Sequence, residues 1–266
     1  MFDLIGQGGG FNWDQLAQQI INGLQLGSIY ALIALGYTMV YGVLRLINFA
    51  HGEFYMGGAF ISYYIAEKWF DKTTIPNWLL LLMMIFGSMS VCALLGVTIE
   101  RLAYRPLRNA PRISVLITAI GVSLLLQQGG ILIFRVAPQP VIGEDVNPFK
   151  TYNFDFPVLG ELTIAGGQAA MFIVSIIFMI ILWFIVTRTN TGRAMRAVSH
   201  DFHTASLMGV NVNRIISITF IIGSALEGAG GMMNATALGT PLDTFYGLLP
   251  GVKAFVAAVL GGIGNI

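Results

Sequence analysis

Residues 15–44 read QLAQQIINGLQLGSIYALIALGYTMVYGVL, and none of them is charged. A helix needs roughly 20 consecutive apolar residues to cross a bilayer, so this run is long enough to span a membrane. Further charge-free or nearly charge-free runs follow at residues 54–66, 73–99, 113–134, 162–187, 215–238 and 244–266. The sequence therefore predicts an all-α polytopic integral membrane protein, with about seven spans or part-spans and a last segment interrupted by glycines.

The composition supports the same fold class. Of the 266 residues, 56% are hydrophobic and 10% are charged, whereas a soluble domain carries about 25% charged residues. The net charge of +1 gives no indication of a nucleic-acid partner. Cys92 is the sole cysteine, which excludes a disulfide framework within the chain and a cysteine metal cluster. We expect membrane lipid to surround most of the protein.

Arginine residues predict the orientation. Lys and Arg collect on the cytoplasmic side of membrane proteins, and Arg is concentrated in two segments, 100–112 and 188–214. We therefore expect these segments to be cytoplasmic loops of a single transmembrane domain, 1–266, with the N-terminus (1–14) and the loop 135–161 outside. Within that loop FDFPVLGELTI, residues 154–164, predicts a small external β-hairpin.

The segment INFAHGEFYMGGAF, residues 47–60, places a histidine and a glutamate inside an apolar chain. One interpretation is a helix start, with Asn48 or Gly52 as cap and Glu53 near the positive end of the helix dipole. The other is a broken or re-entrant helix that lines a translocation path, because irregular backbone at membrane depth occurs where protein or water surrounds it. The candidate path residues are Asn48, His51, Gly52, Glu53 and Glu227.

Glycines are concentrated in IIGSALEGAGGMMNA, residues 221–235. Small residues let helix backbones approach closely, so tight helix packing is one prediction. A hinge next to a moving neighbour is the alternative.

The segment GRAMRAVSHDFHTASLMGVN, residues 192–211, predicts a short cytoplasmic helix. Ala197, Asp201 and Ala205 are spaced i, i+4 and i+8, so they are expected to share one face, which Ala194 joins. The first turn is basic, and Gly209 can close the helix in the left-handed conformation. Such a helix suits docking into a groove of another protein, although an amphipathic helix on anionic lipid is also possible. The residues concerned are Arg193, Ala194, Arg196, Ala197, Asp201, Ala205 and Gly209.

Four long segments resemble the permease subunits of branched-chain amino acid ABC importers (the LivHM permease family), and the LivH-like member in particular. They are ALIALGYTMVYGVLRLINFAHGEFYMGGAFIS (31–62), IERLAYRPLRNAPRISVLITAIGVSLLLQ (99–127), TGRAMRAVSHDFHTASLMGVNVNRIISITFIIGSALEGAGG (191–231) and GVKAFVAAVLGGIGNI (251–266). Chains of this family usually continue past GGIGNI, so the C-terminal helices of the family are expected to be missing from this sequence.

The resemblance implies a function and a set of partners. The chain would be a permease subunit in the bacterial cytoplasmic (inner) membrane, translocating leucine, isoleucine and valine. Its partners would be a second, LivM-like permease, two cytoplasmic ATPases in contact with the 192–211 helix, and an external substrate-binding protein. The chain lacks a Walker A motif, so it is expected to be no enzyme and to bind no cofactor, with ATP on the ATPases.

Other functions are alternatives to this one. The same importer class also includes permeases for urea or other amino acids. A proton-coupled secondary transporter would use Glu53 and Glu227 as proton carriers, but the sequence indicates no intramembrane partner for either. A channel would need a polar filter, and a membrane enzyme would need more than His200 and His203 beside Asp201, which we interpret as solvated residues.

Overall fold

The computed structural model describes residues 13–44, 48–69, 75–108, 110–134, 152–156, 160–164, 166–237 and 241–262. The α-helices are α1 (Trp13–Leu44), α2 (His51–Tyr64), α3 (Asn77–Ile99), α4 (Arg112–Phe134), α5 (Gly166–Arg188), α6 (Asn190–His200), α7 (Phe202–Leu207), α8 (Val212–Ala237) and α9 (Leu248–Leu260). Two π-helical turns, η1 (Ile65–Trp69) and η2 (Glu100–Tyr104), extend α2 and α3, and a 3₁₀ turn, η3 (Arg105–Leu107), follows η2.

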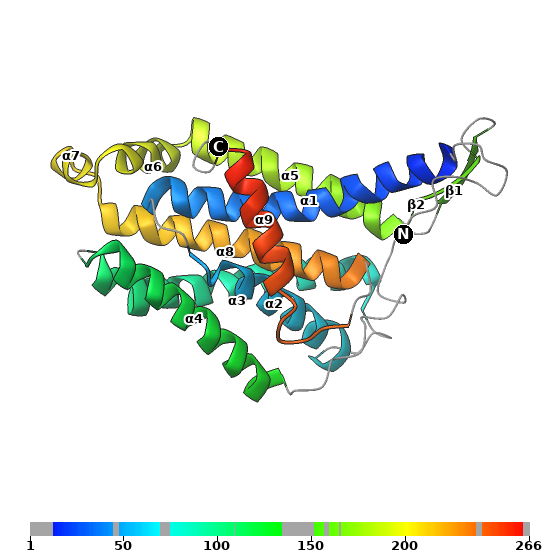
Figure 1. The fold of residues 1–266 in the computed structure, drawn as a ribbon, viewed down its shortest axis with the longest axis horizontal. Helices are drawn as coiled ribbons and strands as arrows, with labels where there is room; N and C mark the ends of the chain where they lie inside the picture. Colours follow the sequence, from blue (N-terminus) through cyan, green and yellow to red (C-terminus); the bar gives the residue numbers. More distant parts are fainter. Residues whose placement is uncertain are drawn as a thin grey trace.

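Helix α8 lies at the centre of the bundle and packs most extensively against α1, α2 and α3 (Figure 1). Helix α9 crosses α1 and touches α2, whereas α4 leans away from the bundle and meets it mainly through α2 and η2. The pair α6–α7 projects at one end of the molecule. The arrangement leaves α2, α4 and α9 around a common space.

Five helical segments are long and apolar enough to cross a membrane: 15–44, 77–107, 113–134, 169–188 and 212–237. Helices α2 and α9 are shorter, with 14 and 13 residues. At 1.5 Å per residue such helices reach about 20 Å, less than the roughly 30 Å of a hydrocarbon core. The predicted all-α polytopic membrane fold is confirmed, and η1 lengthens α2 by a further five residues.

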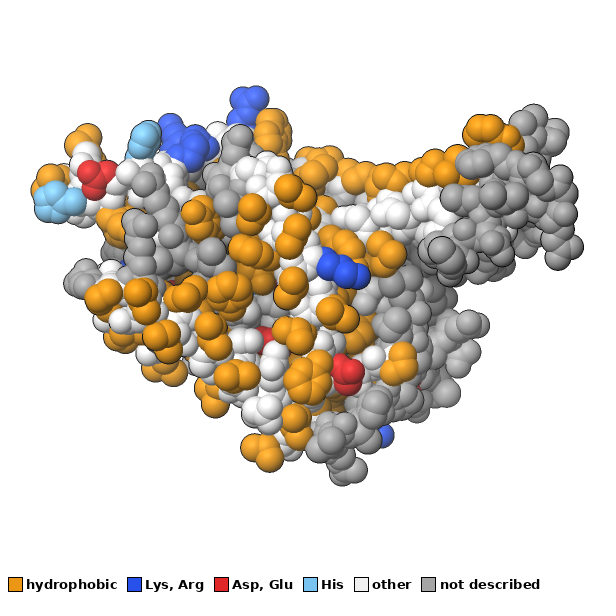
Figure 2. All heavy atoms as spheres, in the orientation of Figure 1, with side chains coloured by type: hydrophobic (Ala, Val, Ile, Leu, Met, Phe, Trp, Pro, Cys, Tyr) orange, Lys and Arg blue, Asp and Glu red, His pale blue; other side chains and the backbone are white. Residues whose placement is uncertain are grey.

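The surface fits a membrane environment. Apolar side chains cover much of α4, α5 and α9 (Figure 2), and Trp78, Leu125 and Phe184 are examples of large hydrophobic residues that are at least half exposed. Lys and Arg side chains gather near α6. A surface of this kind needs lipid or another subunit to cover it.

The glycines of α8 pack tightly. A methyl group added at Gly231 would overlap the backbone at Tyr55 of α2, and one added at Gly58 of α2 would overlap the backbone of Gly228. Gly228 in turn faces Cys92 of α3, whose Sγ would lie 2.8 Å from an added Cβ. Of the two interpretations of this glycine-rich segment, close helix packing is the one that the structure supports.

The segment expected as a loop at 100–112 has regular structure, and the predicted β-hairpin is present. The segment expected as a cytoplasmic loop at 100–112 continues α3 as a helix to Leu107, and Glu100, which is fully buried there, pairs with Arg108 and accepts a 2.8 Å hydrogen bond from Ser217. Strands β1 (Tyr152–Phe156) and β2 (Gly160–Ile164) pair antiparallel as a hairpin. Its external location stays a prediction, and residues 1–12 and 135–151 lie outside the described part.

Candidate functional site

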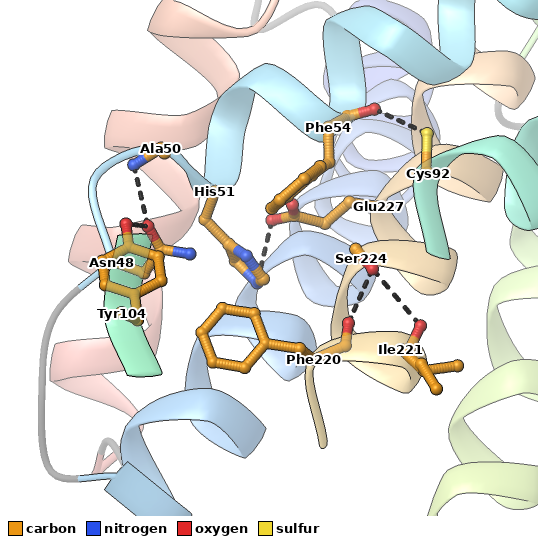
Figure 3. Close-up of polar contacts among 10 residues, drawn as sticks. All are labelled: Asn48, Ala50, His51, Phe54, Cys92, Tyr104, Phe220, Ile221, Ser224 and Glu227. Carbon is orange, nitrogen blue, oxygen red and sulfur yellow. Dashed lines mark hydrogen bonds and ion pairs between the residues drawn. The ribbon is translucent and has the colours of Figure 1, made fainter. Parts of the chain in front are cut away.

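Helix α2 begins inside the bundle rather than at its edge. Its N-cap residue is Ala50, without a side-chain cap. The prediction that Asn48 or Gly52 caps α2 is wrong: Gly52 lies within the first turn, and Asn48 organises the preceding turn. The Oδ1 atom of Asn48 accepts hydrogen bonds from the Ala50 N–H (3.1 Å) and from the hydroxyl of Tyr104 (2.6 Å), as Figure 3 shows. The polar start of α2 is therefore fixed by η2.

The first residue of α2 approaches a carboxylate of α8. The Nε2 atom of His51 lies 3.1 Å from Oε1 of Glu227, and the two side chains are 1% and 0% exposed (Figure 3). The contact has the distance of an ion pair but not the alignment of a hydrogen bond. The ring of His51 also packs edge-on against Tyr37 and Phe54, with centroids 4.5 and 5.9 Å apart. The inference that Glu227 has no intramembrane partner is therefore wrong.

Glu53 has partners on a different helix. Its Oε1 accepts hydrogen bonds from the Ser123 hydroxyl (3.0 Å) and the Gln127 amide (2.7 Å), both near the middle of α4. Its Oε2 is buried and has no hydrogen-bond partner in the described part of the chain. The absence of an intramembrane partner for Glu53 is thus also corrected. These bonds tie α4, which otherwise leans away, to the start of α2.

Sequence reasoning missed Ser123 and Gln127. They are four residues apart in a charge-free segment, so they share one face of a helix. That spacing was the available signal, because a polar pair on one face of an apolar helix calls for a polar partner.

A cavity of about 520 Å³ lies between the start of α2, the middle of α4 and α9. Its polar lining residues are Glu53, Ser123 and Gln127, the last two hydrogen-bonded to the first, and Tyr37, which packs against Phe255. The remaining lining is apolar or glycine, and consists of Phe49, Gly52, Ile120, Leu124, Gly247, Leu248, Gly251, Val252, Phe255 and Val256. The arrangement can hold a small molecule with one polar and one apolar end.

Two of the five path candidates line this cavity and the other three do not. Glu53 and Gly52 line it, and the backbone of Gly52 faces that of Gly247 at the start of α9. His51 and Glu227 form the buried pair directly behind the first turn of α2. Asn48 lies at the preceding turn, against Tyr104. Within the described residues, no group of three His, Cys, Asp or Glu side chains could hold a metal ion.

The predicted cytoplasmic helix is two helices. Asp201 has an extended backbone (φ −157°, ψ 118°), which ends α6 and begins α7. Its Oδ1 accepts hydrogen bonds from the N–H groups of His203 (2.8 Å) and Thr204 (3.2 Å). The prediction that Ala197, Asp201 and Ala205 share one face is therefore wrong: the first two are exposed and Ala205 is buried.

The remaining residues predicted for the segment 192–211 lie as follows in the structure. Gly209 has a φ of +84° and closes α7, as predicted. Ala194 is half-buried, while Arg193 and Arg196 are exposed and donate hydrogen bonds to the Asn190 side chain and to the carbonyl of Val186, respectively. The side chains available to a partner include three large apolar ones, Phe202, Leu207 and Met208.

Several apolar spans, a helix that begins inside the bundle and buried ionisable residues near a cavity define a polytopic membrane transport protein. The chain belongs to the family described as "Branched-chain amino acid transport system / permease component", whose model matches residues 19–266. The chain is 40% identical to the high-affinity branched-chain amino acid transport system permease proteins LivH of Salmonella typhimurium and of Escherichia coli K12 and BraD of Pseudomonas aeruginosa. Each alignment covers 94% of this chain and 80% of the relative. No solved structure matches the chain.

Proposed function

We propose that the chain is a LivH-like permease subunit of an ATP-driven ABC importer in a bacterial inner membrane. It translocates leucine, isoleucine or valine that an external binding protein delivers. The observation that carries the proposal is the start of α2 inside the bundle, where Glu53 lines an open cavity and His51 in the same turn approaches Glu227 of α8. The names of the relatives support the substrate class.

The transport path runs past the start of α2, along Asn48, His51, Gly52, Glu53 and Glu227. The turn at residues 48–50 and the first turn of α2 bring polar side chains to a buried position, where irregular backbone is tolerated because protein surrounds it. Polar side chains at the start of α2 therefore contact the substrate while it is inside the membrane domain.

The energy comes from partner subunits. Two cytoplasmic ATPases bind ATP and dock at α6–α7, and a second, LivM-like permease completes the pore. Helix α6 packs on α5, α8 and α1. A displacement of α6–α7 by the ATPases is therefore transmitted to α8, which carries Glu227. Rigid-body movement of packed helices then switches access from one side to the other.

Reconstitution tests this proposal. Proteoliposomes with both permeases and the ATPases should take up radiolabelled leucine only with ATP on the ATPase side and binding protein on the opposite side. Omitting any one component should reduce uptake to that of empty vesicles. Uptake by this chain alone, without ATP, would support the secondary transporter instead. Competition by unlabelled valine, urea and other amino acids defines the substrate range.

A further inference from the structure

We propose that the cavity between α2, α4 and α9 is a binding site for a free α-amino acid during translocation. The Glu53 carboxylate accepts hydrogen bonds from the ammonium group, and the apolar walls hold an aliphatic side chain. The inference rests on the proposed function, since it takes the transported molecule as the ligand, and it adds a specific site inside the membrane domain.

The size and the lining of the cavity suit such a ligand. Its volume of about 520 Å³ lies within the roughly 300–1,000 Å³ of small-molecule sites. Glu53, Ser123 and Gln127 form a hydrogen-bonded polar group in the lining, and residues of α9 that include Val252 and Phe255 supply apolar surface. Amino acids with branched aliphatic side chains have the same division into a polar and an apolar end.

The charge of the cavity points to an amine. Glu53 is 2% exposed, its Oε1 is occupied by Ser123 and Gln127, and its Oε2 has no partner in the described structure. A buried carboxylate is costly unless it is paired or fully hydrogen-bonded. None of the residues that line the cavity is Lys, Arg or His, and Lys253 of α9 instead lies over the ring of Tyr30, 5.8 Å from its centroid. An ammonium group supplies both the charge and three donors.

A thiol-protection experiment in the complete reconstituted transporter tests the site. Val252 lines the cavity and is 54% exposed, so a Val252→Cys variant should react with N-ethylmaleimide. The native Cys92 is buried, and the transporter without the new cysteine gives the background. Three probes separate the two ends of the ligand: leucine, 3-methylbutylamine, which lacks the carboxylate, and 4-methylpentanoate, which lacks the amine.

We expect leucine and 3-methylbutylamine to slow the labelling of the introduced cysteine and 4-methylpentanoate to have little effect. Adding Glu53→Gln should raise the half-protecting concentration of the two amines about tenfold or more, because a hydrogen bond to a charged group is lost. The matched control is Glu67→Gln, the same chemical change on η1 outside the cavity lining, which should leave protection unchanged.

Four results would overturn the site. Protection by 4-methylpentanoate as strong as by the amine, or protection that survives Glu53→Gln, would show that Glu53 does not bind an ammonium group. A cysteine that reacts in this subunit alone but never in the full transporter would show that the partner permease fills the cavity. ATP-driven leucine uptake is measured in the same vesicles, so uptake without protection would contradict the site and leave the proposed function intact.

Discussion

Glu53 connects two helices that otherwise barely meet, and its role in transport can be separated from its role in folding. Glu53→Gln keeps the shape of the side chain and an oxygen acceptor for Ser123 and Gln127, but it removes the charge. We expect normal amounts of protein in the membrane and leucine uptake reduced about tenfold, the loss expected for one charged hydrogen bond. Wild-type uptake would leave Glu53 only a structural role at the start of α2.

The His51–Glu227 pair is tested by a double-mutant cycle. Removing one partner leaves the other as a buried polar group without its neighbour, which costs about 1–3 kcal/mol. We expect His51→Phe and Glu227→Leu each to lower the thermal unfolding temperature in detergent, and the double variant to lose less than the sum of the two. Additive losses would show that the 3.1 Å approach contributes no coupling.

The sequence was sufficient to identify the ionisable residues but not their partners. His51, Glu53 and Glu227 stand out because charge is rare in apolar segments. Ser123 is 70 positions away from Glu53, and Glu227 is farther still from His51. Such pairs depend on how the helices pack, which neither hydropathy nor local spacing determines.

Helices α2 and α8 are held together at glycines, and two neighbouring glycines provide a matched test. A methyl group at Gly58 would overlap the backbone of Gly228, whereas one at Gly57 would lie 3.8 Å from Cys92 Sγ, an ordinary contact. Gly58→Ala should therefore destabilise the protein by about 1–3 kcal/mol, and Gly57→Ala should have little effect. Thermal unfolding in detergent measures both, and equal effects of the two variants would contradict the close packing.

The segment 192–211 shows where spacing alone misleads. Residues 197, 201 and 205 share a face only in a continuous helix, but an Asp side chain also satisfies the free N–H groups of a new helix start. Asp201 does this for α7, and its hydrogen bonds with Thr204 and the N–H of His203 lower the pKa of its carboxyl. Ala205 consequently packs into the protein's own interior instead of facing a partner.

Two substitutions at Asp201 test whether α7 takes part in coupling. Asp201→Asn keeps a capping oxygen and should retain ATP-driven transport, while Asp201→Ala loses the cap and should uncouple ATP hydrolysis from uptake. Because the pKa is lowered, the contribution of the charged cap is present at neutral pH and is lost as the pH falls through that lowered pKa. Normal coupling in Asp201→Ala would exclude α7 as a docking element.

The orientation of the whole molecule follows from where its charged segments lie. Arg108 bonds to Asn213 in the first turn of α8, so the two Arg-rich segments meet at one end. The β1–β2 hairpin lies at the opposite end from α6–α7 (Figure 1). In intact cells, Asn153→Cys in β1 should react with an impermeant thiol reagent, because the positive-inside rule places the hairpin outside. Labelling only after lysis would reverse the orientation.

Hydropathy predicted the membrane fold because long apolar segments have few alternatives to spanning helices. Hydropathy did not decide how the chain is arranged before α2, because a run of 13 charge-free residues after Glu53 fits both a short span and a broken helix. The cavity could not be predicted at all, because α2, α4 and α9 contribute to it from distant parts of the chain.

The most direct test of the whole account is the energy source of transport in reconstituted vesicles. Leucine uptake is measured with the binding protein present, once with ATP and an ionophore that collapses the proton gradient, and once with an intact gradient but no ATP. An ATP-driven importer predicts full uptake in the first condition and none in the second. Uptake that stops with the ionophore while ATP hydrolysis continues would contradict it and would make Glu53 and Glu227 proton carriers.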